Sequence, residues 1–264
     1  MHERTARALI ALNNRFYRRC AASFDATRSA PWTGWRRVLD AARSTDALDR
    51  ADAGERTRIL DLACGNLRFE RFLARELGGT PMEVYALDAC RELMGAAEGT
   101  DLPPLRIREL DVLGALLAGD TPLQGIPLVD LSACFGFMHH VPGATLRQRL
   151  VDALAGQTRP GGVIALSFWR FMDDARLASK AREADERASA VLGEQGVDVR
   201  EFDEGDHFLG WQDDARALRY CHHVTEAEID ALVAGCSHPV REIDRFFADG
   251  RSGMLNRYLI LQRR

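Results

Sequence analysis

Two acidic residues stand at the ends of short apolar runs, next to a turn of small residues. The first run ends near Asp61 and is followed by Ala63, Cys64 and Gly65, and the second ends at Asp88. Small residues in such a turn let the backbone approach a ligand. An acid at the end of the next strand can accept hydrogen bonds from both hydroxyls of a ribose. The spacing therefore predicts a nucleoside-binding site.

The glycine content of this turn limits which ligand could bind. The pattern G-x-G-x-x-G is absent, and Gly65 is the one glycine of the turn. A pyrophosphate needs a tight glycine cradle at a helix N-terminus. A dinucleotide is therefore disfavoured, and the sequence favours a ligand that contains a ribose but no phosphate.

The elements that must position these residues alternate between strands and helices. Short apolar runs predict strands, in chain order, at 58–63, 83–88, 105–111, 128–134 and 162–169. The stretches between them show the helical spacing of apolar residues, and such alternation is typical of a parallel sheet flanked by helices. We therefore expect an α/β fold with a doubly wound, Rossmann-like sheet, whose ligand lies at the carboxyl ends of the strands.

The other segments surround this sheet, and together they make a single domain of residues 1–264. Leu9, Leu12, Phe16 and Cys20 have the spacing of an amphipathic helix. The stretch from Thr225 is typical of a capping box that opens a late helix. The expected parts are an N-terminal helical cover at 1–50, the core at 57–170, a helical insertion or lid after strand five at 171–224, and a closing helix and strand pair at 225–264.

Composition excludes collagenous, coiled-coil and wholly disordered proteins. The chain has 264 residues, of which 46% are hydrophobic, so it can bury a large core. Its net charge is −4. It shows neither a membrane-spanning run nor a cleavable signal, and we expect a cytoplasmic protein without a membrane partner. The six cysteines form no C-x-x-C pair, which fits reduced thiols. No metal is predicted, because no zinc-ligand spacing is matched by Cys221, His222, His223, Cys236 and His238.

Four segments resemble the successive motifs of class I S-adenosylmethionine-dependent methyltransferases. They are ILDLACGN at 59–66, ALD at 86–88, ELDV at 109–112 and RPGG at 159–162. The resemblance implies S-adenosylmethionine as the cofactor, with Asp88 on its ribose and Asp111 on its adenine amino group. Ala63 and Leu67 replace two glycines of the family's first turn. The cofactor-binding residues implied are Asp61, Ala63, Cys64, Gly65, Asn66, Asp88, Ala89, Asp111, Val112, Cys134 and Phe135.

A narrower resemblance extends outside this core. Short segments that include Phe16-Tyr17, Thr27-Arg28 and Trp211 are similar, in order and spacing, to the eukaryotic tRNA wobble-uridine carboxymethyl methyltransferases. Those enzymes methyl-esterify a carboxymethyl group on the wobble uridine and work with a small activator protein. The resemblance implies tRNA as a partner. A small activator protein is a second partner that the resemblance allows. The substrate-binding residues implied are Tyr17, Trp32, His139, Tyr220 and His222.

The type of acceptor can be weighed from the residues themselves. A carboxylate is already ionised at neutral pH and needs no base. It needs cations to orient it, and a guanidinium group can bind it with two parallel hydrogen bonds. Arg28 and Arg219 are the candidates for this catalytic role. An amine or phenol acceptor would instead require a histidine to take a proton, and of His139 and His140 we expect His140 to face the site.

Two further interpretations stay open at this level. The chain could be a small-molecule methyltransferase that acts on a carboxylate, hydroxyl or amine of a metabolite. It could also be a catalytically dead nucleoside-binding or partner-docking protein, although the intact acids at the strand ends argue against this. Phosphate binding favours clustered cations. The tRNA interpretation therefore gains if the arginine-rich segment 1–43 shares a face with Arg241, Arg245, Arg251 and Arg257.

Overall fold

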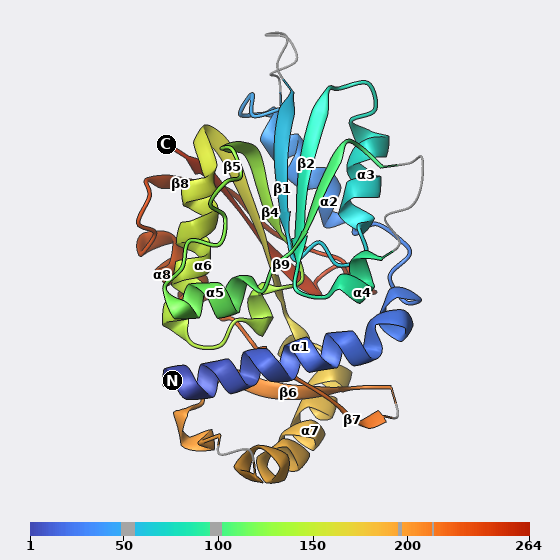
Figure 1. Cartoon of the computed structure of the whole chain (residues 1–264), viewed down its shortest axis with the longest axis vertical. Coiled ribbons are helices and arrows are strands. Elements are labelled where there is room, and N and C mark those ends of the chain that lie inside the picture. The colour runs from blue at the N-terminus through green and yellow to red at the C-terminus, as the bar shows by residue number, and fades with distance from the viewer. Residues whose placement is uncertain (49–55, 96–101, 195–196, 213) are drawn as a thin grey trace.

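The computed structural model describes residues 1–48, 56–95, 102–194, 197–212 and 214–264. Its centre is a seven-stranded sheet with the strand order β3-β2-β1-β4-β5-β9-β8 (Figure 1). Strands β1 to β5 are parallel, and β9 lies antiparallel between β5 and β8. The chain winds outward in both directions from β1 and β4, which confirms the expected doubly wound sheet.

All seven predicted strands are present, with ends that differ from the prediction by a few residues. The strands of this sheet are β1 (Thr57–Leu62), β2 (Met82–Asp88), β3 (Leu105–Glu109), β4 (Val129–Cys134), β5 (Thr158–Trp169), β8 (Val240–Ala248) and β9 (Asn256–Arg263). The helices are α1 (Glu3–Asp25), α2 (Gly34–Arg43), α3 (Arg68–Glu76), α4 (Arg91–Met94), α5 (Val112–Ala118), α6 (Ala144–Gln157), α7 (Ala175–Glu194) and α8 (Glu226–Ala234). Strand β3 ends before Asp111 because that residue already caps α5.

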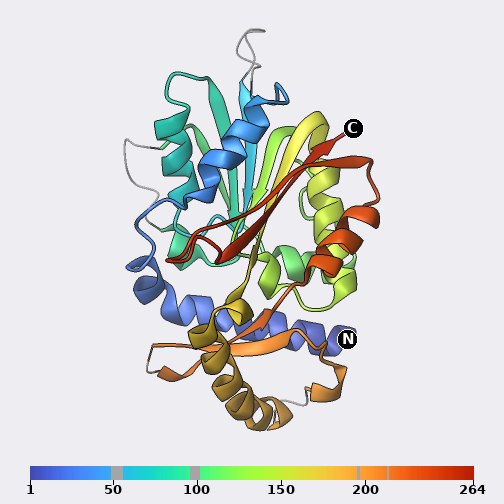
Figure 2. The same ribbon diagram turned by 180° about the vertical axis from the view of Figure 1, so that it is seen from behind.

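Helices cover both faces of the sheet, as Figures 1 and 2 show. Helices α2 and α3 pack on one face through residues such as Trp35 and Phe72. Helices α5, α6 and α8 pack on the other face through residues such as Leu150 and Ile229. Helix α8 begins with the predicted capping box at Thr225. These two apolar layers hold the carboxyl ends of the parallel strands at one edge of the sheet.

Helix α1 and the insertion close this edge of the sheet (Figure 1). Helix α1 packs against α7 and against a separate hairpin of β6 (Asp206–Trp211) and β7 (Asp214–His222). Helix α7 confirms the expected helix in the insertion, but the sequence did not predict the hairpin. Residues Ala217 to His222 are all buried, so β7 lacks the apolar and polar alternation that reveals a half-exposed strand.

Two further expectations concern the membrane and the thiols. Among the described helices, none is long and apolar enough to cross a membrane. All six cysteines are free thiols. The end of the expected N-terminal cover, at residue 50, lies outside the described residues.

The side chain of Asn13 joins α1 to the hairpin. Its amide oxygen accepts a hydrogen bond from the backbone N–H of Tyr220 at 2.8 Å, and its amide nitrogen donates to the carbonyl of the same residue at 3.1 Å. Both residues are buried. Buried backbone groups need partners, and here one side chain satisfies both groups of a residue in β7. This pair of bonds ties α1 to β7.

Replacing Asn13 by alanine should lower the free energy of unfolding by about 1–3 kcal/mol, because the buried N–H of Tyr220 loses its partner. The carbonyl of Tyr220 keeps its contact with Nδ1 of His140. Urea denaturation measures the difference. Asn14→Ala is the control, since the neighbouring side chain bonds to Asp111 in a more exposed setting. We expect the control to cost less than about 1 kcal/mol, and an equal loss in both variants would contradict this role of Asn13.

Candidate active site

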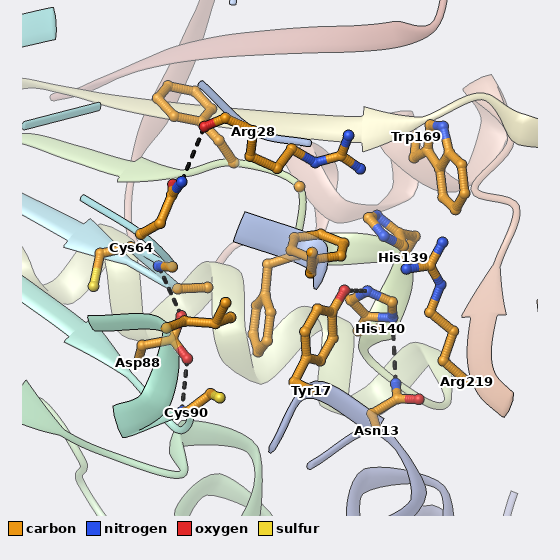
Figure 3. Close-up of a pocket in the computed structure, with 18 of the residues that line it drawn as sticks. Asn13, Tyr17, Arg28, Cys64, Asp88, Cys90, His139, His140, Trp169 and Arg219 are labelled. Atoms are coloured by element: carbon orange, nitrogen blue, oxygen red, sulfur yellow. Dashed lines mark hydrogen bonds between the residues drawn. The ribbon is translucent and has the colours of Figure 1, made fainter. Parts of the chain in front are cut away.

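A cavity of about 660 Å³ lies at the carboxyl ends of the parallel strands, beneath α1 and the insertion. Figure 3 shows Asp88 on one side of it, Arg219 and His139 on the other, and Tyr17 between them. The cavity therefore brings together residues from both ends of the sequence. The predicted site residues that line it are Tyr17, Arg28, Trp32, Asp61, Ala63, Cys64, Gly65, Asn66, Asp88, Ala89, Asp111, Val112, Phe135, His139, His140 and Arg219.

Three predicted residues, Cys134, Tyr220 and His222, do not line the cavity that the described residues form. Cys134 is the last residue of β4, and its side chain is fully buried in the core. The hydroxyl of Tyr220 donates to Asp206 at 2.6 Å, and the ring of His222 bonds to Asp206 and to Glu228. These side chains hold the hairpin and α8 together, so their position does not support the predicted contacts with cofactor or substrate.

The turn after β1 keeps a glycine-like backbone although two of its residues are not glycine. Ala63, Gly65 and Leu67 have φ angles of 65°, 55° and 59°. This left-handed region costs a residue with a Cβ about 1–2 kcal/mol. Gly65 faces open space, because a Cβ built on it would meet nothing within 4 Å. The chain thus pays conformational energy to present this backbone to the cavity.

Asp88 ties the end of β2 to this turn. One carboxylate oxygen accepts the N–H of Gly65 at 2.9 Å, and the other accepts the N–H of Cys90 at 2.8 Å. Burial raises the pKa of this carboxyl, while the backbone N–H groups favour its ionised form. Each oxygen keeps a lone pair. Asp88 can therefore accept further hydrogen bonds from a ligand in the cavity.

A second acid, Glu70, lies beside Asp61, and sequence reasoning missed it. Glu70 is 0% exposed. Burial, and then the neighbouring Glu70 carboxyl, raises the pKa of Asp61 well above its usual range. Burial also raises the pKa of Glu70 to about 7. Glu70 falls on the inner side of α3 within a charged stretch, where its residue type gives no sign of burial.

The other predicted acid, Asp111, has a structural task as well. Its carboxylate accepts the N–H of Gly114 at 2.9 Å and so caps α5. It also accepts the amide of Asn14 at 3.0 Å, which links α5 to α1. The residue lines the cavity beside Val112.

Tyr17 and His140 form a hydrogen-bonded pair in the middle of the cavity. The Nδ1 atom of His140 lies 2.9 Å from the carbonyl of Tyr220 and 3.2 Å from the amide nitrogen of Asn13 (Figure 3). Because the carbonyl can only accept and the Asn13 amide already donates to it, we assign the proton to Nδ1. The Nε2 atom then accepts the hydroxyl of Tyr17 at 2.7 Å (Figure 3). Burial and the charge of Arg219 lower the pKa of His140 to about 3. Burial raises the pKa of Tyr17 to about 12.

The neighbouring His139 is the less constrained of the two histidines. Its Nδ1 atom is buried without a hydrogen-bond partner among the described residues, and burial lowers its pKa well below the usual value. Both histidines line the cavity, but the nitrogens of His140 are engaged by Tyr17 and Tyr220. Both are held neutral by burial.

Arg219 and Arg28 reach the cavity from β7 and from the end of α1, and Figure 3 shows their guanidinium groups on the same side. Arg219 is 6% exposed and lies over the rings of Phe16, Trp169 and Trp211 at 4.9–5.6 Å. The guanidinium carbon of Arg28 lies 4.6 Å from the ring centroid of Phe24. Burial and the charge of Arg219 lower the pKa of Arg28. In the part of the chain that the structure describes, no carboxylate forms an ion pair with either group.

Among the residues that the structure describes, two groups of side chains lie close enough together to be considered as metal ligands. They are His139 with His140 and Cys221, and Asp203 with Asp206 and His222. In the first, both ring nitrogens of His140 are already hydrogen-bonded. In the second, Asp206 already accepts from Tyr220 and His222. We assign no metal to either group.

Comparison with known proteins supports the fold. No protein-family model and no curated protein matches the sequence. The structure is similar to a S-adenosylmethionine-dependent methyltransferase from Methanosarcina mazei, with 16% identity, a TM-score of 0.55, and coverage of 79% of this chain and 93% of that one. It is also similar to one from Clostridium acetobutylicum, with 14% identity, a TM-score of 0.51, and coverage of 83% and 89%.

A third similar structure is an O-methyltransferase family protein from Burkholderia thailandensis. It shares 15% identity with a TM-score of 0.53, and the match covers 94% of this chain and 61% of that one. At such identities the likeness concerns the fold. The sheet order, the cavity at its carboxyl edge and these neighbours together define the Rossmann-like fold of class I S-adenosylmethionine-dependent methyltransferases.

The left-handed turn makes a prediction about stability. Ala63→Gly should raise the free energy of unfolding by about 1 kcal/mol, because glycine adopts a positive φ without the penalty of a Cβ. Gly65→Ala, two residues away, should lower it by a similar amount for the opposite reason. Urea denaturation of both variants is the measurement. A loss of stability in Ala63→Gly would show that the alanine methyl group contributes more than its backbone costs.

Proposed function

We propose that the chain is a S-adenosylmethionine-dependent methyltransferase whose acceptor group is a carboxylate. The observation that carries the proposal is that the cavity has an acidic side, at Asp88, and a cationic side, at Arg28 and Arg219 (Figure 3). The proposed methyl donor is a cation with a ribose, and the proposed acceptor is an anion. Each side of the cavity therefore has the charge that suits one reactant.

The acidic side fits the cofactor by its donors and acceptors. The lone pairs of Asp88 can receive two ribose hydroxyls, and the open space before Gly65 lets a ligand approach the backbone. Asp61 and Asp111 supply further acceptors. When bound, S-adenosylmethionine supplies a methyl group on a positively charged sulfur. Alignment of the reactants alone can contribute about 7–11 kcal/mol to such a displacement.

The cationic side favours a carboxylate over an amine or a hydroxyl. Arg219 is held rigidly by its aromatic neighbours and has donors to orient a planar anion. A protonated amine would be repelled by Arg219 and Arg28. The two histidines are poor bases because burial lowers both pKa values. A carboxylate oxygen needs no base, so its methylation requires only what this cavity provides.

The arrangement of the other arginines favours a small acceptor over tRNA. Arg245 forms ion pairs with Glu226, Asp230 and Glu242, and Arg257 pairs with Glu226. These neutralised cations are not available to phosphates. The carboxymethyl group of a tRNA wobble uridine has the same acceptor chemistry and is the second candidate. Exposed arginines along α1 favour it, namely Arg4, Arg15 and Arg18.

Binding of the cofactor can be tested with its demethylated product, S-adenosylhomocysteine, by calorimetry. We expect the wild-type protein to bind it. Asp88→Ala should weaken the affinity about ten- to a hundred-fold, because hydrogen bonds to a charged group are lost. Glu109→Ala is the matched control, since this exposed acid is paired with Asp88 in the sheet register but does not line the cavity. No binding to the wild-type protein would contradict the proposed function.

The type of acceptor can be tested with S-adenosylmethionine that carries a tritiated methyl group, added with the small-molecule fraction or the tRNA of a cell extract. We expect label in the small-molecule fraction that alkali releases as volatile methanol, because base hydrolyses methyl esters but not N-methyl groups or ethers. Arg219→Met should reduce the label about ten- to a hundred-fold, and Arg15→Met on the exposed side of α1 should not.

The other outcomes of this experiment separate the alternatives. Alkali-labile label in tRNA would favour the wobble-uridine substrate. Alkali-stable label would contradict a carboxylate acceptor. Binding of the cofactor without transfer to either fraction would favour a catalytically dead nucleoside-binding protein.

A further inference from the structure

A third partly buried guanidinium group lies on the wall of the cavity, which the exposed cations Arg176 and Lys180 also line. Arg68, the first residue of α3, lines the cavity, and its guanidinium carbon lies 5.1 Å from the ring centroids of both Trp32 and Trp35. One terminal nitrogen donates to the carbonyl of Ala30 at 2.8 Å. Within the described ranges, no carboxylate pairs with Arg68, and its buried Nε–H has no acceptor. The group is oriented by aromatic rings but its charge is not neutralised.

Trp35 adds a second unsatisfied donor at the same place. Its indole nitrogen is buried, and no described residue accepts its hydrogen. Buried donors without a partner cost about 1–3 kcal/mol each and are rare in folded proteins. Both Trp35 and Arg68 line the cavity. Both donor atoms are shielded even with the cavity empty, so the half-buried Arg68 side chain as a whole, held by the two tryptophans, is the group that a ligand in the cavity can reach.

The three guanidinium groups are close enough to influence one another. Burial and the charge of Arg28 lower the pKa of Arg68 to about 10, as burial and the charge of Arg219 lower that of Arg28. Asp249 also lines the cavity, but its carboxylate oxygens are occupied by other hydrogen bonds. Its oxygens accept hydrogen bonds from Thr33, Gly34, Asn256 and Tyr258. The charges of Asp249 and Asp61 offset part of this repulsion, but among the described residues neither carboxylate forms an ion pair with Arg68, so an anionic group of a ligand can still bind there.

The reactants of the proposed function bring fewer anionic groups than the cavity can bind. The cofactor has one carboxylate in its amino-acid part, and the proposed acceptor has the carboxylate that is methylated. Since a guanidinium group typically binds one carboxylate through a pair of bonds, Arg28 and Arg219 account for these two. Among the cations of the cavity that are at least partly buried, Arg68 is left over, while Arg176 and Lys180 are exposed to solvent.

We propose that the acceptor carries a second anionic group, a carboxylate or a phosphate, which binds to Arg68 where Trp32 and Trp35 hold it. This inference rests on the proposed function and narrows its substrate to molecules with two anionic groups. One group would lie at Arg219, where methyl transfer occurs, and the other would fix the far end of the molecule. Arg68 is in this view a specificity-determining residue rather than a catalytic one.

The test uses simple anions bound to the protein saturated with S-adenosylhomocysteine. Calorimetry would compare the dicarboxylates from succinate to pimelate with the monocarboxylates of the same chain length, and 3-phosphonopropionate would probe a phosphate-like second group. We expect the best dianion to bind at least about ten-fold more tightly than its monoanionic counterpart. Arg68→Met should remove this advantage. Arg75→Met, on the exposed side of the same helix, should keep it.

The remaining outcomes overturn the inference in distinct ways. Equal binding of dianions and monoanions to the wild-type protein, or binding of neither, would exclude a second anionic site. An advantage that survives in a folded Arg68→Met variant would place the site elsewhere. A ten-fold loss of S-adenosylhomocysteine affinity in that variant would show that Arg68 binds the cofactor's own carboxylate. Failure of the wild-type protein to bind S-adenosylhomocysteine would instead refute the proposed function itself.

Discussion

The hydrogen bond from the N–H of Gly65 to Asp88 connects the two strand ends on which the site depends. It holds the turn after β1 in a conformation with three positive φ angles, and α3 starts directly after that turn. The start of α3 in turn decides where Arg68 and Glu70 lie. One partly buried carboxylate therefore positions the open backbone before the cavity, the cation Arg68 on its wall and the acid Glu70 beside Asp61.

The cationic side depends on a different constraint, which is the attachment of α1 to the hairpin. Asn13 binds the backbone of Tyr220, and one turn later Tyr17 binds His140. Phe16, on the same helix, packs against Arg219 of β7. Segments about 200 residues apart in the chain thus build one wall of the cavity. A change in the angle of α1 would move the tyrosine, the histidine and the arginine together.

Several polar side chains around the cavity do not stabilise the protein while the cavity is empty. Unpaired guanidinium groups, a buried carboxyl pair and buried donors without acceptors all cost free energy. Proteins keep such groups mainly where a ligand satisfies them. Arg28, Arg68 and Arg219 all line this one cavity without an ion pair among the described residues, and this separates the site from an ordinary gap between layers.

The sequence by itself determined the sheet and its ligand-binding edge, because apolar runs and helical periodicity are local properties. It also indicated Asp88 and Gly65, whose roles follow from their place at strand ends. Only the tertiary structure decided which polar residues meet. Glu70, Trp35 and Arg68 have no local signature, since burial and missing partners are set by contacts distant in sequence. The hairpin was not predicted for the same reason: α1 and α7 both pack against it, and the resulting burial removes the alternation of apolar and polar residues.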